Sequence, residues 1–252
     1  MNIASSLLRT LVIALLVLLR PATCIADPIA IWLGPWAPTF DPIQTSAGLG
    51  AAASAFRSFG PLGDGEPLSG TSARAFSRAS ADSATFGSAS ASTGLAFNRP
   101  FQLSGSPNGW DVTLSGRLVG LLFAASPTNP SATVFAGAEI LAGGPSFLLG
   151  PFTIAPDRQR DVDVNQMAHG FLSDGTYTVI GFLRTTASVD ATFDPFASGG
   201  ARSDFASQEG QGFFVGVDAT PVPEPSAFIL LGTGTLALAQ VCRSTARKNA
   251  SS

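Results

Sequence analysis

The chain has 252 residues, and 17 of its 31 charged side chains are aspartate or glutamate. All 17 acidic residues but only nine of the 14 basic ones lie between Asp27 and Pro225, which gives this stretch a net charge of −8; the only lysine, Lys248, lies outside it. An acidic, lysine-free surface repels polyanions, so composition argues against nucleic acid and against an anionic membrane surface as partners.

The first 26 residues have the features of a secretory signal peptide. Arg9 is the only charged side chain before the apolar stretch Leu11–Leu19, and small residues follow at Cys24 and Ala26. We therefore predict a signal helix within residues 1–26, cleavage after Ala26, and passage of the remaining chain through the Sec translocon. Lipid attachment at Cys24 is the alternative, but the three residues before it lack the leucine and the small penultimate residue of a lipid-attachment box.

The region that follows is expected to fold without covalent cross-links. Both cysteines, Cys24 and Cys242, lie in the terminal segments, and about 200 residues are enough for one domain held by packing alone. The region is rich in Gly, Ser, Ala, Thr, Phe and Pro, a composition typical of strands and turns. Low complexity and disorder are the alternative for Ala47–Ala91. Aromatic residues that recur through the region argue against disorder, because disordered chains lack them: Phe56, Phe59, Phe76, Phe86 and Phe97.

The pattern along the chain predicts strands after an irregular start. We expect residues 27–70 to be an irregular lead-in rich in Pro, Gly and Ala, with one short strand. From Thr71 small or polar residues alternate with apolar ones through Phe97, which predicts two half-buried strands with a break near Gly87-Ser88. Asn98-Arg99-Pro100 interrupts the alternation. Further strands are predicted at 101–104, 111–123, 132–141, 147–154, 160–167, 176–184, 187–193 and 211–219.

Short strands at intervals of about a dozen residues, without a long amphipathic helix, predict an all-β fold. We expect an antiparallel β-sandwich or jelly-roll-like domain over residues 71–220, flanked by the N-terminal signal helix and a C-terminal hydrophobic helix. Asp174-Gly175 predicts a turn. Tyr177, the only tyrosine, follows this turn and matches the tyrosine corner of β-sandwiches; a solvent-exposed strand tyrosine is the alternative.

The residues between the terminal segments include few of the side chains that serve as catalytic nucleophiles or bases. They contain no cysteine or lysine and a single histidine, His169, and the chain has no Gly-x-Ser-x-Gly motif. We interpret His169, beside Gly170, as a loop residue. We therefore predict no catalytic residue and no cofactor. An enzyme of unrecognised type is the alternative, and it is the third hypothesis beside the two that close this subsection.

One acidic cluster has the alternate spacing of a calcium loop, formed by Asp157, Asp161, Asp163 and Asn165. Its sixth and twelfth positions lack the glycine and the glutamate that an EF-hand requires. We interpret the segment as a strand with one polar face and predict no metal site. A structural calcium ion at a sandwich edge is the alternative.

Sugar binding would need exposed aromatic side chains, and Trp32, Trp36 and Trp110 are the only large candidates. We expect them to pack in the core or in the lead-in. A carbohydrate-binding module predicts instead a cluster of aromatic and acidic side chains at the rim, and burial of all three tryptophans would count against it.

The last 31 residues combine three features in a fixed order. Pro223-Glu224-Pro225 favours an extended, protease-accessible segment, because each proline fixes φ and lacks a backbone donor. The apolar run 227–241 would measure ~22 Å as a helix, against a hydrocarbon thickness of ~30 Å, which suits temporary membrane residence. Three basic residues follow and favour a cytoplasmic C-terminus: Arg243, Arg247 and Lys248. A permanent single-pass anchor is the alternative and leaves the topology unchanged.

Residues 222–252 thus resemble the PEP-CTERM sorting signal that exosortase-type enzymes recognise in Gram-negative bacteria that make extracellular polysaccharide. The resemblance implies a transient inner-membrane intermediate, processing by an exosortase-like enzyme, and a final location at the cell surface or in the extracellular matrix. It assigns sorting or processing roles to Pro223, Glu224, Pro225, Arg243, Arg247 and Lys248. Residues 88–97 and 172–179 also resemble the Gly- and Ser-rich β-sandwich domains that often precede such tails.

Two functional hypotheses follow. The first is an exported, non-enzymatic cell-surface or matrix protein associated with exopolysaccharide. The second is a carbohydrate-binding or adhesive β-sandwich module.

Overall fold

The structure is a computed structural model, and it describes residues 29–60, 72–83, 87–125, 129–154, 156, 158–190 and 199–223. The predicted signal helix, the cleavage site at Ala26, the hydrophobic span 227–241 and the sorting residues after Pro223 lie outside this part of the chain. Within it, every regular element is a β-strand. The strands are β1 (Ile29–Trp32), β2 (Ala37–Phe40), β3 (Gln44–Ala47), β4 (Ala51–Gly60), β5 (Ser72–Ser83), β6 (Ser88–Ser104), β7 (Trp110–Ala125), β8 (Ser131–Ile140), β9 (Ser146–Thr153), β10 (Arg158–Leu172), β11 (Gly175–Asp190), β12 (Gly199–Phe205) and β13 (Gly212–Pro221).

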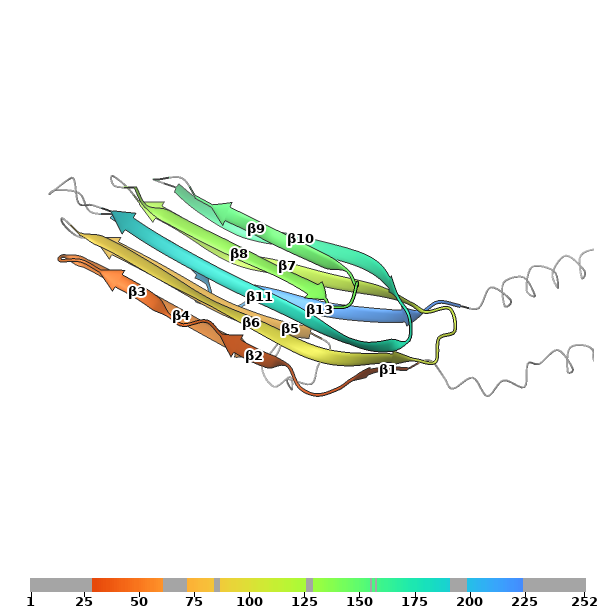
Figure 1. Ribbon diagram of the computed structural model, residues 1–252. Coiled ribbons are helices and arrows are strands. Elements are labelled where there is room, and N and C mark those ends of the chain that lie inside the picture. The colour runs from red at the N-terminus through yellow and green to blue at the C-terminus, as the bar shows by residue number, and fades with distance from the viewer. Residues whose placement is uncertain are drawn as a thin grey trace, which may run out of the picture.

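The strands form two antiparallel sheets that lie face to face (Figure 1). Sheet A has the order β1-β6-β11-β8-β9, with β2 and β3 also paired to β6. Sheet B contains β10, β7, β12, β5 and β13, with β4 on the outer side of β5. The predicted all-β, antiparallel architecture is confirmed.

Strands β12 and β13 occupy a single position in sheet B, end to end between β5 and β7. Residues 201–204 of β12 pair with 121–124 of β7, and residues 212–221 of β13 pair with 110–119 of the same strand. Residues 206–211 leave the sheet between the two and form a loop over its outer face. Strand β12 was not predicted, because Gly-Gly-Ala-Arg-Ser-Asp-Phe offers one large apolar side chain and no clear alternation.

The size of the core side chains differs between the two ends of the sandwich. At the end where β6 begins, Ala91 lies opposite Ala187, which lies opposite Ala132. The other end holds large buried rings, including Trp110, Phe101 and nearby Tyr177. Because small side chains let the sheets approach, hydroxyl groups meet across the core: Ser77 of β5 and Thr185 of β11 lie 2.6 Å apart.

Three glycines in two core strands, β7 and β11, make room for phenylalanine rings from other strands. An added Cβ would lie 2.2 Å from the Phe97 ring at Gly181, 2.1 Å from Phe147 at Gly116, and 2.2 Å from Phe205 at Gly120. The glycines thus provide the space that the rings fill.

The lead-in differs from the irregular segment that the sequence predicts, since residues 29–60 form four strands. Three of them, β1, β2 and β3, each have four residues and pair with successive parts of β6, and β4 pairs with β5. Short strands interrupted by prolines cover the long edge of β6 in pieces, which leaves fewer unpaired backbone groups on that edge.

The predicted interruption at Asn98-Arg99-Pro100 is wrong, because β6 runs through it without a break. The Pro100 carbonyl accepts a hydrogen bond from Leu33 N–H at 2.9 Å, so it points toward the lead-in. The nitrogen of a strand residue points to the same side as its carbonyl. The missing donor of Pro100 therefore faces the gap between β1 and β2, and no ladder bond to β11 is lost.

The predicted break between the strands 176–184 and 187–193 is likewise absent, because β11 runs without interruption from Gly175 to Asp190; residues 191–193 lie outside the described part of the chain.

Candidate functional site

The sorting junction, defined here as Pro221, Val222 and Pro223, is attached to the folded domain. Pro221 is the last residue of β13 and pairs with Trp110. Val222 N–H donates to the Gly109 carbonyl at 3.0 Å, and the Asn108 side-chain amide donates to the Pro223 carbonyl at 3.2 Å. The first proline of the Pro-Glu-Pro motif is exposed but held against the β6–β7 connection.

Asp174 holds that connection in place from the turn between β10 and β11. Its carboxylate accepts hydrogen bonds from the Trp110 indole N–H at 2.8 Å, from Gly105 N–H at 2.8 Å and from Ser106 N–H at 3.3 Å. The Trp110 hydrogen bond is the main cause that lowers the pKa of Asp174; the two backbone amides add to it, and desolvation opposes them.

The predicted tyrosine corner is confirmed at the same turn. The Tyr177 hydroxyl donates to the Ser173 carbonyl at 3.0 Å, four residues upstream, while its ring is buried. The turn itself, predicted from Asp174-Gly175, joins β10 of sheet B to β11 of sheet A.

Both ends of the described chain lie at this end of the sandwich (Figure 1). Ile29 at the start of β1 pairs with Ser104 at the end of β6, and Pro221 pairs with Trp110 at the start of β7. The alanine-rich end is therefore the part of the domain farthest from the sorting junction.

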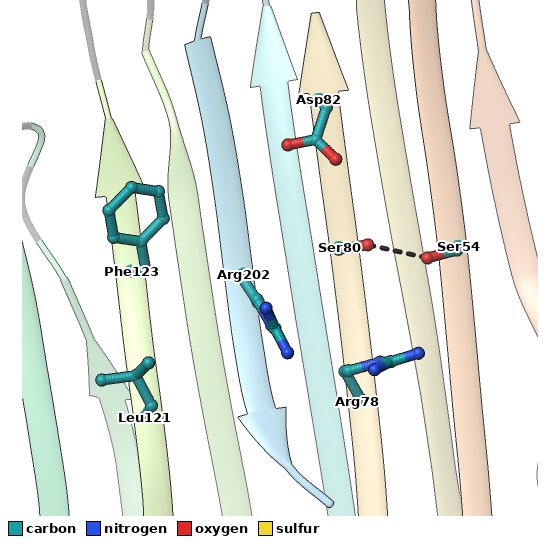
Figure 2. A pocket seen from close by; sticks show the side chains of 7 residues that line it. All are labelled: Ser54, Arg78, Ser80, Asp82, Leu121, Phe123 and Arg202. Atoms are coloured by element: carbon teal, nitrogen blue, oxygen red, sulfur yellow. Dashed lines mark hydrogen bonds between the residues drawn. The ribbon is translucent and has the colours of Figure 1, made fainter. Parts of the chain in front are cut away.

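A second feature is a hollow of about 500 Å³ on the outer face of sheet B, here called the outer hollow (Figure 2). The pairing register of four neighbouring strands brings its lining residues side by side. Arg202 of β12 lies directly opposite Phe123 of β7 and Ser80 of β5, and Ser80 lies opposite Ser54 of β4. The residues that line it are Ser54, Arg78, Ser80, Asp82, Leu121, Phe123 and Arg202.

Charges are separated within the outer hollow. Figure 2 shows Asp82 at one end, and Arg78 and Arg202 at the other. Arg202 forms an ion pair with Asp204, whereas Arg78 has no carboxylate within ion-pair distance among the described residues. Both guanidinium groups donate to the Ser207 hydroxyl, at 3.1 Å from Arg78 and 3.0 Å from Arg202.

The loop 206–211 forms a fixed wall at the arginine end. Asp204, only 3% exposed, accepts from Ala206 N–H at 3.2 Å and from Ser207 N–H at 3.0 Å. The side-chain carbonyl of Gln211 accepts from Ser207 and Gln208 N–H, each at 3.1 Å. Desolvation would raise the pKa of Asp204. The hydrogen bonds that its carboxylate accepts from Ser207 and Ala206, together with the charge of Arg202, outweigh desolvation, so the pKa is lowered.

His169 lies in strand β10, so its predicted loop position is wrong. It pairs with Thr113 in the register, and its exposed ring nitrogen Nδ1 lies 3.0 Å from the Thr113 hydroxyl. Gly170 pairs with Val112 of β7, so the ladder extends beyond residue 167, where the strand 160–167 was predicted to end.

The acidic cluster proves to be a strand with one polar face, as predicted. Asp161, Asp163 and Asn165 are exposed at alternate positions of β10 around buried Val162, while Asp157 lies outside the described residues. The Asp163 carboxylate forms a two-pronged ion pair with Arg117, at 3.0 and 2.8 Å. The described ranges contain no group of three or more His, Cys, Asp or Glu side chains suited to a metal ion.

The tryptophans pack as predicted and do not form a surface platform. Trp36 and Trp110 are 2% and 1% exposed. Trp32 is half-buried against the core, with its ring centroid 5.3 Å from that of Phe101 and the Arg99 guanidinium 4.4 Å above it.

No helix in the described part of the chain has the length and apolar character that crossing a bilayer demands.

Residues 221–248 match the family of the PEP-CTERM protein-sorting motif, which confirms the predicted resemblance. The match begins at the last residue of β13 and includes all six predicted sorting residues. The chain therefore carries a sorting motif that indicates export and processing by an exosortase-type enzyme.

Other comparisons add little. No curated protein sequence matches the chain. The enzymatically active domain of bacteriophage CBA120 tailspike protein 4 is 13% identical, with a TM-score of 0.19, over 78% of this chain and 20% of that one. A solved structure of carbohydrate-binding modules from the β-sandwich superfamily is 12% identical, with a TM-score of 0.16, over 59% of this chain and 55% of that one.

Proposed function

We propose that this protein is an exported, non-enzymatic component of the cell surface or extracellular matrix, associated with exopolysaccharide. The observation that carries the proposal is the sorting motif at residues 221–248. In this account the Sec translocon exports the chain and cleavage follows Ala26. Residues 227–241 then hold it briefly in the inner membrane, with Arg243, Arg247 and Lys248 on the cytoplasmic side.

The position of the motif supports release of an intact domain. The last strand ends at Pro221, so cleavage beyond Pro225 removes no strand from either sheet. Pro223 is exposed, which suits recognition of the motif by an exosortase-like enzyme. Removal of the tail would convert a tethered intermediate into a soluble, acidic surface protein.

The non-enzymatic assignment rests on the side-chain chemistry available. The region between Asp27 and Pro225 has no thiol and no amine, apart from the new N-terminus. Its one histidine is exposed on a strand beside a threonine hydroxyl. The Thr113 hydroxyl is within hydrogen-bond reach of the ring, but among the described residues no carboxylate bonds to His169 to orient it as a base.

A carbohydrate-binding or adhesive module is the second candidate, and the outer hollow is the observation that favours it. The tryptophans do not support it, since two are buried and the third packs against the core. In this second candidate function, the polar and aromatic side chains of the outer hollow contact the carbohydrate instead of the tryptophans.

The sorting proposal is tested by replacing Pro223, Glu224 and Pro225 together with alanine and fractionating cells of the native host. The variant should accumulate with the membrane fraction, whereas a Ser251→Ala control, outside the matched motif, should be released like the wild type. Release of the triple variant at the wild-type level would contradict a role for the tripeptide in processing.

A further inference from the structure

We propose that the outer hollow binds a short segment of a neutral, hydroxyl-rich glycan. This inference rests on the proposed association with exopolysaccharide and gives that association a site and a ligand class. Four strands of sheet B contribute the lining: β4, β5, β12 and β7.

The polar groups of the outer hollow complement hydroxyl groups. The guanidinium groups of Arg78 and Arg202 only donate hydrogen bonds, the side-chain oxygens of Asp82 are acceptors, and the hydroxyls of Ser54 and Ser80 both donate and accept. A sugar hydroxyl also donates and accepts, so one glycan satisfies both ends of the hollow. A purely anionic or purely cationic ligand would satisfy one end and be repelled at the other.

The spacing of these groups suits more than one sugar unit. Arg78 and Asp82 are four residues apart on β5 and face the same side, which separates their Cα atoms by ~13 Å at the usual rise of a strand. Ser80 lies between them and forms a 2.7 Å hydrogen bond with Ser54 (Figure 2). A chain laid along β5 would thus meet a donor, a hydroxyl pair and an acceptor in succession.

Phe123 supplies an apolar surface beside this polar row. Its side chain is 37% exposed and lies opposite Arg202, with Leu121 two residues away on the same face of β7. The negative face of an aromatic ring attracts the weakly positive C–H groups of a sugar ring. Gly200 keeps the Asp82 end open, since a Cβ there would lie 2.7 Å from the Asp82 carboxylate.

Charge favours a neutral glycan over an acidic one. The region between the terminal segments carries a net charge of −8, which repels polyanions at long range. Arg202 is paired with Asp204, which lies behind the lining, and the charges of Asp82 and Arg78 at the two ends of the hollow sum to zero. The site therefore has no net positive charge to attract a polyuronate.

The arginine end is preorganised. Ser207 accepts a hydrogen bond from each guanidinium and is itself fixed by its backbone N–H, which donates to Asp204 and Gln211. Side chains that are ordered before binding lose less conformational entropy on binding.

Affinity electrophoresis of the mature protein isolated from its native host tests the inference. The gels contain dextran, a β-1,3-glucan, a galactomannan or, as the acidic probe, polygalacturonate. We expect retardation by at least one neutral polysaccharide, unchanged at an ionic strength of about 1 M, where charge interactions are screened within ~3 Å. Retardation by polygalacturonate alone, or by none of the four, overturns the inference.

Single substitutions locate the site. Arg78→Gln, Asp82→Asn and Phe123→Ala should each weaken binding about tenfold, the loss expected for one charged hydrogen bond or one apolar contact. Arg117→Gln is the matched control, because Arg117 lies on the same sheet face and is paired with Asp163 outside the hollow. Arg202 is left intact, since its loss would leave Asp204 buried without its ion-pair partner.

The outcomes separate this inference from the proposed function. If all three variants bind like the wild type, the hollow is not the site, although an association with polysaccharide stands. If no gel retards the protein while the tail is still processed in the host, the glycan inference fails and the sorting proposal stands. Circular dichroism of each variant excludes loss of the fold as the cause of weaker binding.

Discussion

The side-chain amide of Asn108 donates a hydrogen bond to the Pro223 carbonyl, 3.2 Å away, and so joins the β6–β7 connection to the first residue of the sorting tripeptide. Val222 N–H adds a second bond, to the carbonyl of neighbouring Gly109. The tail therefore leaves the domain from a defined position. Under the proposed function, the processing enzyme therefore meets Pro223 directly beside the end of the sandwich.

Replacing Asn108 with alanine should loosen this junction while leaving the sheets intact. With the side-chain bond removed, the Val222–Gly109 bond is the one hydrogen bond left to residues 222–223 within the described part of the chain, so the Val222 amide should exchange its hydrogen several-fold faster. Hydrogen exchange followed by NMR or mass spectrometry measures this. Asn165→Ala, on the exposed face of β10, is the control, and unchanged exchange in Asn108→Ala would show that the contact does not restrain the tail.

The contact between Gly181 and Phe97 predicts a large effect from one methyl group. Because an added Cβ would lie 2.2 Å from the ring, Gly181→Ala should lower the free energy of unfolding by about 1–3 kcal/mol, as overpacking does. Gly48→Ala is the control, since its Cβ would meet its neighbours at 3.5 Å or more. Urea unfolding compares the two, and equal stability would argue against tight packing at Gly181.

The hydroxyl pair between the sheets should behave as a unit. Thr185→Val leaves the buried Ser77 hydroxyl with only a 3.4 Å contact to the Thr93 carbonyl, so we expect a loss of about 1–3 kcal/mol in the free energy of unfolding. The double variant with Ser77→Ala should recover much of it. Ser54→Ala, which breaks a surface hydroxyl pair, should cost less than about 0.5 kcal/mol. Additive losses in the double variant would contradict this coupling.

Much of the fold is predictable from local sequence, but the outer hollow is not. Alternation in residues 72–83 identifies β5, and Asp174-Gly175 with Tyr177 identifies the turn and its tyrosine corner. These signals lie within a few residues of one another. Arg78, Phe123 and Arg202 come from three separate strands, and only the pairing of β12 with both β5 and β7 brings them together.

The strands of the lead-in, residues 29–60, could not be predicted from the local sequence pattern either. Four-residue strands that contain or border prolines have little periodicity of their own. They form because β6 offers a long edge to pair with, which is a property of the assembled sheet.

Acid should destabilise the domain partly through Asp204. Its pKa is lowered in the folded protein, so its contribution to stability is complete above the unfolded value of about 3.9 and is lost as pH falls through the folded value. The free energy of unfolding of the wild type should therefore fall below about pH 4, and Asp204→Asn should fall less steeply. Ser207→Ala, which removes one stabilising partner, should be intermediate. Identical slopes for wild type and Asp204→Asn would contradict this assignment.

The intact mass of the protein isolated from its native host tests the sorting proposal most directly. We predict a mature chain that begins at Asp27 and lacks residues 227–252. A mature protein that retains Ala227–Ser252 would contradict processing at the sorting tail.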